Sequence, residues 1–597
     1  MTEFANYKAP RANEAVLCEP PASAWARVAS KNARLSSTTK SNDTVNNCKQ
    51  NSDSFSTSEI LWSGIPLRDI RSWTRRDAIR FSHCNTNSCS DLTSECSNDS
   101  KLWYVSGHQP ELFHPGVWYK NFVLYEAARE QNAVSLNVVI DHDAASPVSI
   151  AVPTKNDDGS IGSKVVALEG WAGLGTQLES STESPDLNVP WELTIDHGTL
   201  NWQNLQDDVS ELLAPLDIRN PLIQKMVPMI RESISSGAPI GKAIAMARHQ
   251  IERDCGIQNY EVLFSQLAQG RGFAAFVYEI LSSIKSFRAI YHRSRNDYRI
   301  YHQIKNESQP IPPLAEQSKD GVVWTEAPFW VYSTKSPTRR ALWIRHANHR
   351  IILSDLHEWE SRIDCDADFE AITAWWQSLM RSQVAVRPRA LTSTLFMRLA
   401  IGDLFVHGIG GGKYDQITDL IIKRWCGIGA PTFAVATATL FLPMKHDAAM
   451  SRRTLLTSEA RDRLRDHRFN PERLVSNRSS EETQSMRSQV LERIKSIPIG
   501  AAKILWHKSL QELKSAIRSS LLEEVHIDQA SLASDLQASI AEDLQQKLRS
   551  SREYSIAVFP DGWTQKKLQT LAVHSMLADD NHHIVDLVNI GNNSDAK

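Results

Sequence analysis

Short apolar runs, each followed by a loop and then by an amphipathic stretch, recur along the middle of the chain. Residues 102–105 form an aromatic and β-branched run, a helical pattern covers 117–130, and a second apolar run covers 136–140. This order predicts a strand, a helix and a second strand. A right-handed parallel crossover would bring the loops after both strands to one edge of a sheet, where open α/β folds hold ligands.

The pattern changes further along the chain. From 204 to 284 apolar residues recur at helical spacing, which predicts an inserted helical subdomain. Residues 321–354 then show short apolar runs separated by turn residues, and we expect the sheet to resume there. A further strand is expected at 404–406, before a glycine-rich loop at 408–413 and a helix over 414–425.

The segment 457–552 is charged and helical in pattern. Two apolar stripes recur in it at helical spacing, the first formed by Leu510, Leu513, Ile517 and Leu521 and the second by Leu532, Leu536, Ile540, Leu544 and Leu548. The stripes predict a long antiparallel helical hairpin with coiled-coil packing. We interpret this hairpin as a packing or dimerisation device, because neither stripe carries a chemically reactive side chain.

These patterns divide the chain into seven segments. From 36 to 58, 15 of 23 residues are Ser, Thr or Asn, which cannot bury enough apolar surface to offset chain entropy. We therefore expect a largely disordered N-terminal region with one short docked element. After it we expect two halves of a parallel-sheet core around a helical connecting domain, then a coiled-coil domain, a core-docking segment and a polar tail. The seven segments are 1–101, 102–200, 201–320, 321–450, 451–553, 554–580 and 581–597.

Composition narrows the class of protein. The 66 Lys and Arg residues nearly balance 69 Asp and Glu residues, so the net charge of −3 gives no overall positive field for nucleic acid or an anionic membrane. No apolar run approaches the roughly 20 residues of a membrane span, and the start lacks a signal-peptide core. We expect a cytoplasmic protein with reduced thiols. Cys84, Cys89 and Cys96 miss the spacing of a zinc knuckle, so no metal centre is expected.

The loop after the first predicted strand is the first candidate site. Gly107, His108 and Gln109 follow the first predicted strand, and His114 precedes the helix. Free N–H groups at a helix start attract phosphate, and imidazoles can stabilise charge that develops in phosphoryl or adenylyl transfer. The alternative is an ordinary tight turn.

The second loop contains Asp141, His142 and Asp143, directly after a buried strand. Two carboxylates can hold Mg²⁺ or an ammonium group, and a histidine can act as acid or base near neutral pH. The alternative is an N-cap for the next helix.

A glycine-rich junction is the third candidate. It is no Walker A motif, because Tyr414 stands where Ser or Thr would be needed. Its glycines still allow a ligand to approach the backbone closely. We expect binding through Gly410, Gly411, Gly412, Lys413 and Asp415, and we interpret His407 as a packed residue. Arg387 could grip a carboxylate or phosphate, or be a solvated surface charge.

Four landmarks in order resemble those of a known family, the bacillithiol biosynthesis cysteine-adding enzymes, or cysteine ligases (BshC). Residues 105–113 are similar to that family's G-Q-Q-x-G-L-F segment, and 140–143 to its E-D-H-D. Residues 386–388 with 408–412 resemble its L-R-P and G-G-P-G-E region, and 558–565 its terminal F-P-x-G-x-x-Q-E-R.

The chain departs from the family at several landmark positions. His108 stands where the family has Gln, Glu111 where it has Gly, and Ile140 where it has Glu.

The resemblance implies a Rossmann-like core related to nucleotidyltransferases and class I synthetases, with an inserted connecting domain and a coiled coil that supports homodimers. It also implies a carbon–nitrogen ligase that joins L-cysteine to an amino-sugar conjugate such as glucosaminyl malate. ATP or ADP is the expected nucleotide, and Mg²⁺ is a candidate ion.

In the resulting scheme, His108, His114 and the amides after Gly107 hold phosphate. Asp141 and Asp143 bind a metal or the ammonium, and His142 is the general base. Arg387 clamps a carboxylate, and the loop from Gly410 to Lys413 closes on the substrate. The alternatives are a nucleotidyltransferase-like enzyme of other specificity and a catalytically silent scaffold that uses the coiled coil.

Overall fold

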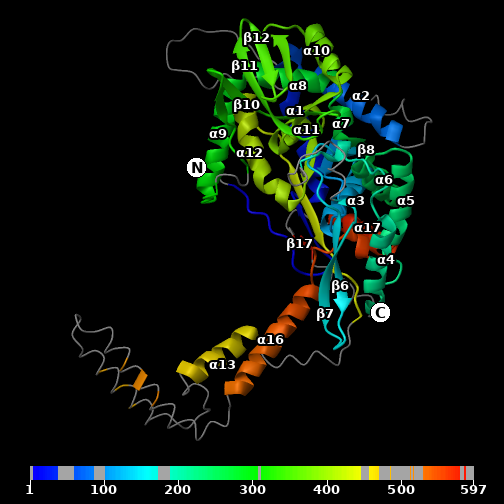
Figure 1. Cartoon of the computed structure of the whole chain (residues 1–597), viewed down its shortest axis with the longest axis vertical. Helices are drawn as coiled ribbons and strands as arrows, with labels where there is room; N and C mark the ends of the chain where they lie inside the picture. Colours follow the sequence, from blue (N-terminus) through cyan, green and yellow to red (C-terminus); the bar gives the residue numbers. More distant parts are fainter. Residues whose placement is uncertain are drawn as a thin grey trace. The chain divides into compact units, whose positions relative to one another are not determined.

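The computed structural model describes most of the chain. The described residues are 4–37, 60–85, 101–171, 188–306, 311–445, 456–469 and 529–577, with isolated residues between 485 and 515 and at 584–585. They form two compact units, drawn in Figure 1. The first comprises Met1–Val152, Lys164–Pro443 and Arg552–Lys597, and the second comprises Pro153–Ser163 and Met444–Ser551.

A mostly parallel sheet forms the centre of the first unit, and the fold class is mixed α/β as predicted. Among the described residues, its strands in spatial order are β17 (Ile584–Val585), β1 (Ala15–Glu19), β16 (Ala434–Thr439), β15 (Leu404–His407), β4 (Trp103–His108), β5 (Val134–Val139) and β8 (Tyr260–Leu263). The strands from β16 to β8 are parallel, and β1 runs antiparallel to both of its neighbours.

The predicted strand–helix–strand unit is confirmed. β4 pairs in parallel with β5 from Trp103↔Val134 to His108↔Val139, and α3 (Pro115–Glu130) connects them. Proline suits the first turn of a helix because its missing N–H has no intrahelical partner there. The first unit therefore holds the loops after β4 and β5 at one sheet edge.

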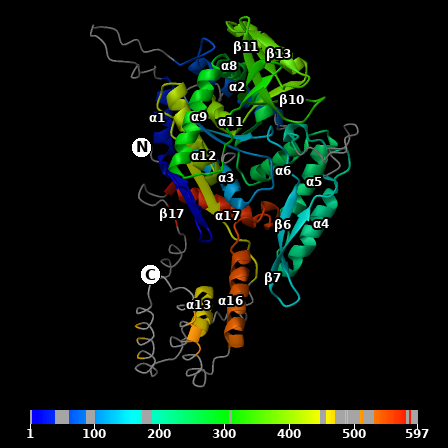
Figure 2. The ribbon, with the colours of Figure 1, turned by 60° about the vertical axis from the view of Figure 1, so that its left-hand side comes forward.

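A second, antiparallel sheet lies at the top of the first unit in Figures 1 and 2. Its strands are β9 (Glu316–Lys319), β10 (Val322–Ser333), β11 (Arg340–Ala347), β12 (Arg350–Ser354), β13 (Glu360–Asp364) and β14 (Val384–Pro388). The expectation that the main sheet resumes at 321–354 is therefore wrong. Short turns join β10, β11, β12 and β13, and such turns permit only antiparallel pairing, whereas a parallel pair needs a long crossover.

Helices surround both sheets. Besides α3, the described α-helices of the first unit are α1 (Trp25–Ser37), α2 (Leu67–Asn85), α4 (Trp202–Leu213), α5 (Ile223–Ser235), α6 (Ile240–Asp254), α7 (Phe264–Leu267), α8 (Arg271–Ser282), α9 (Ile284–Tyr301), α10 (Phe369–Arg381), α11 (Ala390–Ala400), α12 (Ile409–Trp425) and α17 (Trp563–Leu577). The predicted helical segment 204–284 thus contains α4 to α8, but it also supplies β8 to the main sheet. None of the helices in the described ranges is long and apolar enough to cross a membrane.

The N-terminal region contributes more than the one docked element expected. Residues 15–19 form β1 in the main sheet, and α1 and α2 pack beside it. Arg71 and Arg75 of α2 bind the buried carboxylate of Asp403, at 2.5 and 2.8 Å. The polar segments near 38–59 and 86–100, and the side chains of the three cysteines weighed as a zinc knuckle, lie outside the described residues.

In the second unit, α13 (Thr457–Phe469) packs against α16 (Gln529–Arg549). The turn between β6 (Ser149–Lys155) and β7 (Ile161–Ala167) joins this unit, where Gln545 exchanges two hydrogen bonds with the backbone of Ile161 at 2.5 and 2.8 Å. Of the second apolar stripe, Leu532 is buried and Leu544 is exposed. The first stripe lies outside the described residues, so the coiled coil stays a prediction.

Candidate functional site

A cleft of about 760 Å³ opens where the parallel strands of the main sheet end. The loops after β4, β5 and β15 all line it, because the carboxyl ends of parallel strands share one edge. The charged residues and histidines that line it are Lys8, Arg11, His108, His114, Lys120, His142, Asp143, His407, Lys413, Asp415, Arg552 and Glu553. Three segments far apart in sequence therefore meet at one site.

His108 is the last residue of β4, and His114 is the N-cap residue of α3. The Nδ1 atom of His114 accepts a hydrogen bond from the Gly116 N–H at 3.1 Å and so caps the helix. Burial, followed by the nearby charge of Lys120, lowers the pKa of His108 to about 3, and burial lowers the pKa of His114 to about 4. Both rings are neutral at pH 7, so they offer a phosphate hydrogen bonds and no positive charge.

Lys120, which the sequence analysis missed, supplies that charge. It is 2% exposed, and its Nζ donates to the carbonyl of Gly107 at 3.0 Å. Burial and the neighbouring Arg248 lower the pKa of Lys120 to about 8, so the ammonium form predominates at pH 7. A lysine beside Asn121 within the largely apolar run 117–124 is the sequence signal that could have identified it.

Arg552 brings a second cation to the same part of the cleft. Its Nη2 donates to the Thr437 hydroxyl at 2.9 Å, and Glu553 faces its Nε at 3.5 Å. A Cβ atom on Gly116 would lie 2.4 Å from the backbone oxygen of Ala438 and 2.5 Å from Nη2, so glycine lets the first turn of α3 approach both β16 and the guanidinium.

The structure separates the two carboxylates that were predicted to share a cation. Asp141 turns away to α7, where it accepts hydrogen bonds from the N–H and hydroxyl of Ser265 at 2.9 and 2.5 Å. Burial, followed by repulsion from Glu192, raises the pKa of Asp141 to about 7. Asp143 instead lines the cleft, where it accepts from Gln109 at 2.8 Å and faces Arg339 at 3.1 Å.

His142 also lines the cleft but is almost fully buried. Its Nε2 lies 3.2 Å from the Ser393 hydroxyl, and its ring packs 4.5 Å from that of Phe264. Its Nδ1 has no hydrogen-bond partner. Burial lowers the pKa of His142 to about 4, although Asp143 opposes the shift. No carboxylate forms a hydrogen bond with this ring, which weakens its assignment as the general base.

Arg387 is not available as a clamp for a substrate, which corrects the prediction. Its Nε and Nη2 bind the two carboxylate oxygens of Glu192 at 2.9 and 3.0 Å, and the pair is buried beside Tyr332. Bidentate geometry is the reason an arginine was expected to grip a carboxylate. The carboxylate that it holds belongs to the chain itself.

The glycine-rich junction is a helix start and not a closing loop, which corrects a second prediction. Gly408 is the N-cap of α12, and Gly410, Gly411 and Gly412 form its first turn. The first N–H groups of a helix have no intrahelical partner, so this turn presents donors to the cleft. Lys413 lies on the exposed side of the same turn.

His407 and Asp415 form a buried pair that the sequence analysis did not connect. The His407 Nε2 lies 2.8 Å from one oxygen of Asp415, and Arg398 binds that oxygen at 2.7 Å. Thr394 donates to the other oxygen at 2.6 Å. Burial alone would raise the pKa of Asp415, but Arg398 and His407 hold it well below its usual range. Asp415 therefore orients protein groups and is not free for a substrate.

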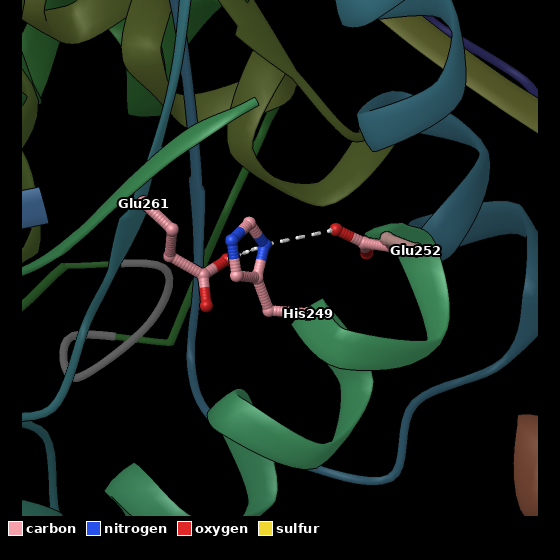
Figure 3. Close-up of side chains that lie close together, drawn as sticks. All are labelled: His249, Glu252 and Glu261. Carbon is pink, nitrogen blue, oxygen red and sulfur yellow. Dashed lines mark ion pairs between the residues drawn. The ribbon is translucent and has the colours of Figure 1, made fainter. Parts of the chain in front are cut away.

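One cluster among the described residues has the spacing of a metal site. His249 Nδ1 lies 3.6 Å from Glu252 and 4.0 Å from Glu261. Figure 3 draws these three side chains. The guanidinium of Arg248 already binds these carboxylates at 2.6 and 2.5 Å. Trp118, Asn121 and Asn137 donate further hydrogen bonds to them. Arg248 thus takes the place of a cation, and the cluster is an internal ion-pair network.

The carboxylates that line the described part of the cleft do not fit Mg²⁺ either. Asp143 faces Arg339, Asp415 faces Arg398, and Glu553 faces Arg552. Since each carboxylate already has a cationic partner, a magnesium ion would have to displace an arginine.

Comparison of the sequence with models of known families found no match, and comparison with curated proteins found no similar sequence.

Proposed function

We propose that the chain is a nucleotide-dependent carbon–nitrogen ligase with a Rossmann-like core, which activates a carboxylate and joins it to an amine. The observation that carries this proposal is the meeting of a buried lysine, two helix starts and several neutral imidazoles in one cleft. Buried charges are costly and are retained at sites that bind or transform ligands.

The cationic end of the cleft suits a phosphate chain. Lys120 and Arg552 supply positive charge, and the N–H groups at the start of α12 supply donors. A volume of about 760 Å³ lies within the range of cofactor and ligand pockets. ATP or ADP therefore fits this end, with Lys120 and Arg552 taking the neutralising role that a metal ion has elsewhere.

A carboxylate of the same cleft suits an amine. The side chain of Asp143 is 37% exposed, and Gln109 orients it through a hydrogen bond of 2.8 Å. A carboxylate held in this way can accept hydrogen bonds from a substrate ammonium group. The cleft thus offers groups for both classes of reactant in a ligase.

The resemblance to the cysteine ligases supports L-cysteine and an amino-sugar conjugate as the substrate pair, in the manner of bacillithiol assembly. Three of its four landmarks, with residues from 105–113, 140–143 and 408–412, line the cleft. The neighbouring 386–388 segment is buried in β14, next to Glu192. The same cleft is compatible with nucleotidyl transfer, a reaction that transfers a nucleotide and forms no amide.

The test is a reaction of the purified full chain with ATP, L-cysteine and a panel of amino-sugar conjugates. Mass spectrometry detects an amide product, and coupled assays separate phosphate from pyrophosphate release. Lys120→Met should lower turnover at least 100-fold and weaken the melting-temperature shift caused by ATP. Lys566→Met, at an exposed position on α17, is the matched control.

Absence of both a nucleotide-induced shift and turnover in the unmodified chain overturns the proposal. Nucleotide transfer without amide formation would identify the nucleotidyltransferase alternative, and partner binding without turnover would identify a scaffold.

A further inference from the structure

We infer that His407 is the general base of the cleft, with Asp415 as the group that orients it. This inference rests on the proposed ligase function and names the residue that removes the proton from the attacking amine. The observation behind it is that His407 lies between a buried carboxylate on one side and the first turn of α12 on the other.

The hydrogen bonds of Asp415 determine which ring nitrogen carries the proton. Arg398 and Thr394 both donate to Asp415, so its oxygens act as acceptors. The 2.8 Å contact with His407 therefore places a proton on Nε2. In a neutral imidazole the other nitrogen, Nδ1, then carries the lone pair and can accept a proton.

Gly411 leaves room beside that lone pair. A Cβ atom at position 411 would lie only 2.6 Å from the His407 Nδ1, whereas the glycine leaves this nitrogen beside the cleft-lining first turn of α12. The rings of Phe405 and Phe433, at 4.5 and 5.1 Å, hold the imidazole from its sides. The charged groups acting on the ring are Asp415, Arg398 and Lys120.

The other imidazoles that line the described cleft lack this arrangement. His114 uses Nδ1 to cap α3, and its Nε2 is 3.8 Å from Glu553, beyond a hydrogen bond. His142 contacts the hydroxyl of Ser393, and His108 contacts the carbonyl of Gln109. A carboxylate that fixes the tautomer of a histidine and stabilises its charged form is the arrangement used for general bases.

The proposed step balances as follows. The co-reactant is an acyl phosphate or acyl adenylate formed from ATP and the carboxylate substrate. The amine nitrogen attacks the acyl carbon, so a C–N bond forms, and the C–O bond to the phosphate breaks with its electron pair leaving on oxygen. The proton lost by the nitrogen passes to His407 Nδ1. Asp415 stabilises the resulting imidazolium, and N–H groups of α12 can stabilise negative charge on the acyl oxygen.

The test combines kinetics with histidine ¹⁵N NMR of the full chain. His407→Gln should lower kcat for amide formation at least 100-fold and leave the ATP-induced melting shift within the error of the unmodified protein. The comparator His197→Gln, at an exposed position that does not line the cleft, should lose less than twofold. Added imidazole should restore part of the activity of His407→Ala. In the NMR spectrum, His407 should show a protonated Nε2 and an unprotonated Nδ1.

Each outcome separates the two proposals. A fully active His407→Gln variant, or an His407 protonated on Nδ1 at neutral pH, overturns the base assignment and leaves the ligase in place. An unmodified chain that is inactive with every substrate pair overturns the ligase, and the base assignment falls with it. Should His407→Gln fail to fold, the NMR measurement on the unmodified chain still decides the tautomer.

Discussion

The buried imidazole of His142 makes stability depend on pH. Its pKa is about 4 in the folded chain and about 6.5 in an unfolded one. Because the folded pKa is the lower one, the contribution of His142 is fully present above about pH 6.5 and is lost as the pH falls toward 4. One such histidine lowers the free energy of unfolding by about 2 kcal/mol between pH 7 and pH 5.

The measurement is urea unfolding of the unmodified chain and of His142→Gln at both pH values. Asp141 acts in the opposite direction, because a raised carboxyl pKa favours the folded chain as the pH falls through about 7. The difference between variants isolates His142, and the variant should lose about 2 kcal/mol less. His197→Gln, at an exposed position, should retain the original pH dependence. Equal pH dependence in all three proteins would contradict the prediction.

Gly411 offers a second test at the scale of one residue. Alanine is favoured over glycine inside a helix by about 1 kcal/mol, so Gly411→Ala gains helix propensity. Its new methyl group would nevertheless lie 2.6 Å from His407 Nδ1. We expect turnover to fall at least tenfold with the melting temperature within a few degrees of the original.

Gly410→Ala is the comparator for that variant, since its Cβ would meet only the Tyr414 hydroxyl, at 3.4 Å. Both changes alter the same turn of α12, but only the change at 411 reaches the imidazole. Equal losses of turnover in the two variants would show that the effect comes from the helix start in general.

At the scale of elements, the sequence pattern predicted those helices and strands whose formation depends on residues close together in the chain. The β4–α3–β5 unit and the strand β15 were predictable because their apolar periodicity and their capping residues lie close together in sequence. The first turn of α12 was not, because three glycines have poor helix propensity and tertiary packing holds them helical. At Gly412, for example, a Cβ atom would lie 2.5 Å from the side chain of Val435, so this turn of the helix packs closely against β16.

Predictions about side-chain roles failed where a partner comes from a distant segment. Arg387 and Glu192 are 195 residues apart in sequence, and Asp141 and Ser265 are 124 apart. No spacing within one motif reveals such pairs. The meeting of three loops at one cleft was predictable for the opposite reason, because parallel topology alone brings the carboxyl ends of strands together.

The Arg387–Glu192 pair gives a prediction at this scale, because it ties the 3₁₀ turn Trp191–Leu193 to β14. Arg387→Met leaves a buried carboxylate without its guanidinium and should lower the free energy of unfolding by about 3 kcal/mol or more. The double variant with Glu192→Gln should lose less than the sum of the two single losses. Urea unfolding of all four proteins measures the coupling, and additive losses would show that the pair contributes no interaction of its own.

At the scale of the whole molecule, the chain leaves the first unit after Pro443 and returns to it at Arg552. The chain contributes to the cleft both before it leaves this unit and after it returns. Thr437 of β16 and Arg552 both line the cleft, and a hydrogen bond of 2.9 Å joins them. Residues between these points belong to the second unit, together with Pro153–Ser163. The cleft therefore needs the return of the chain, and none of the described residues between 444 and 551 lines it.

This division predicts what removal of the helical segment does. A chain in which a short Gly/Ser linker replaces 444–551 should keep the first unit folded, because that unit has its own buried core. Its melting-temperature shift with ATP should match that of the full chain within about 2 °C, while a dimer formed through the helices should become a monomer in sedimentation. A truncated chain that stays dimeric would place the dimer contact on the first unit. Loss of the ATP shift in a folded truncated chain would place the nucleotide on the helical unit, so the cleft would then serve the carboxylate and the amine alone.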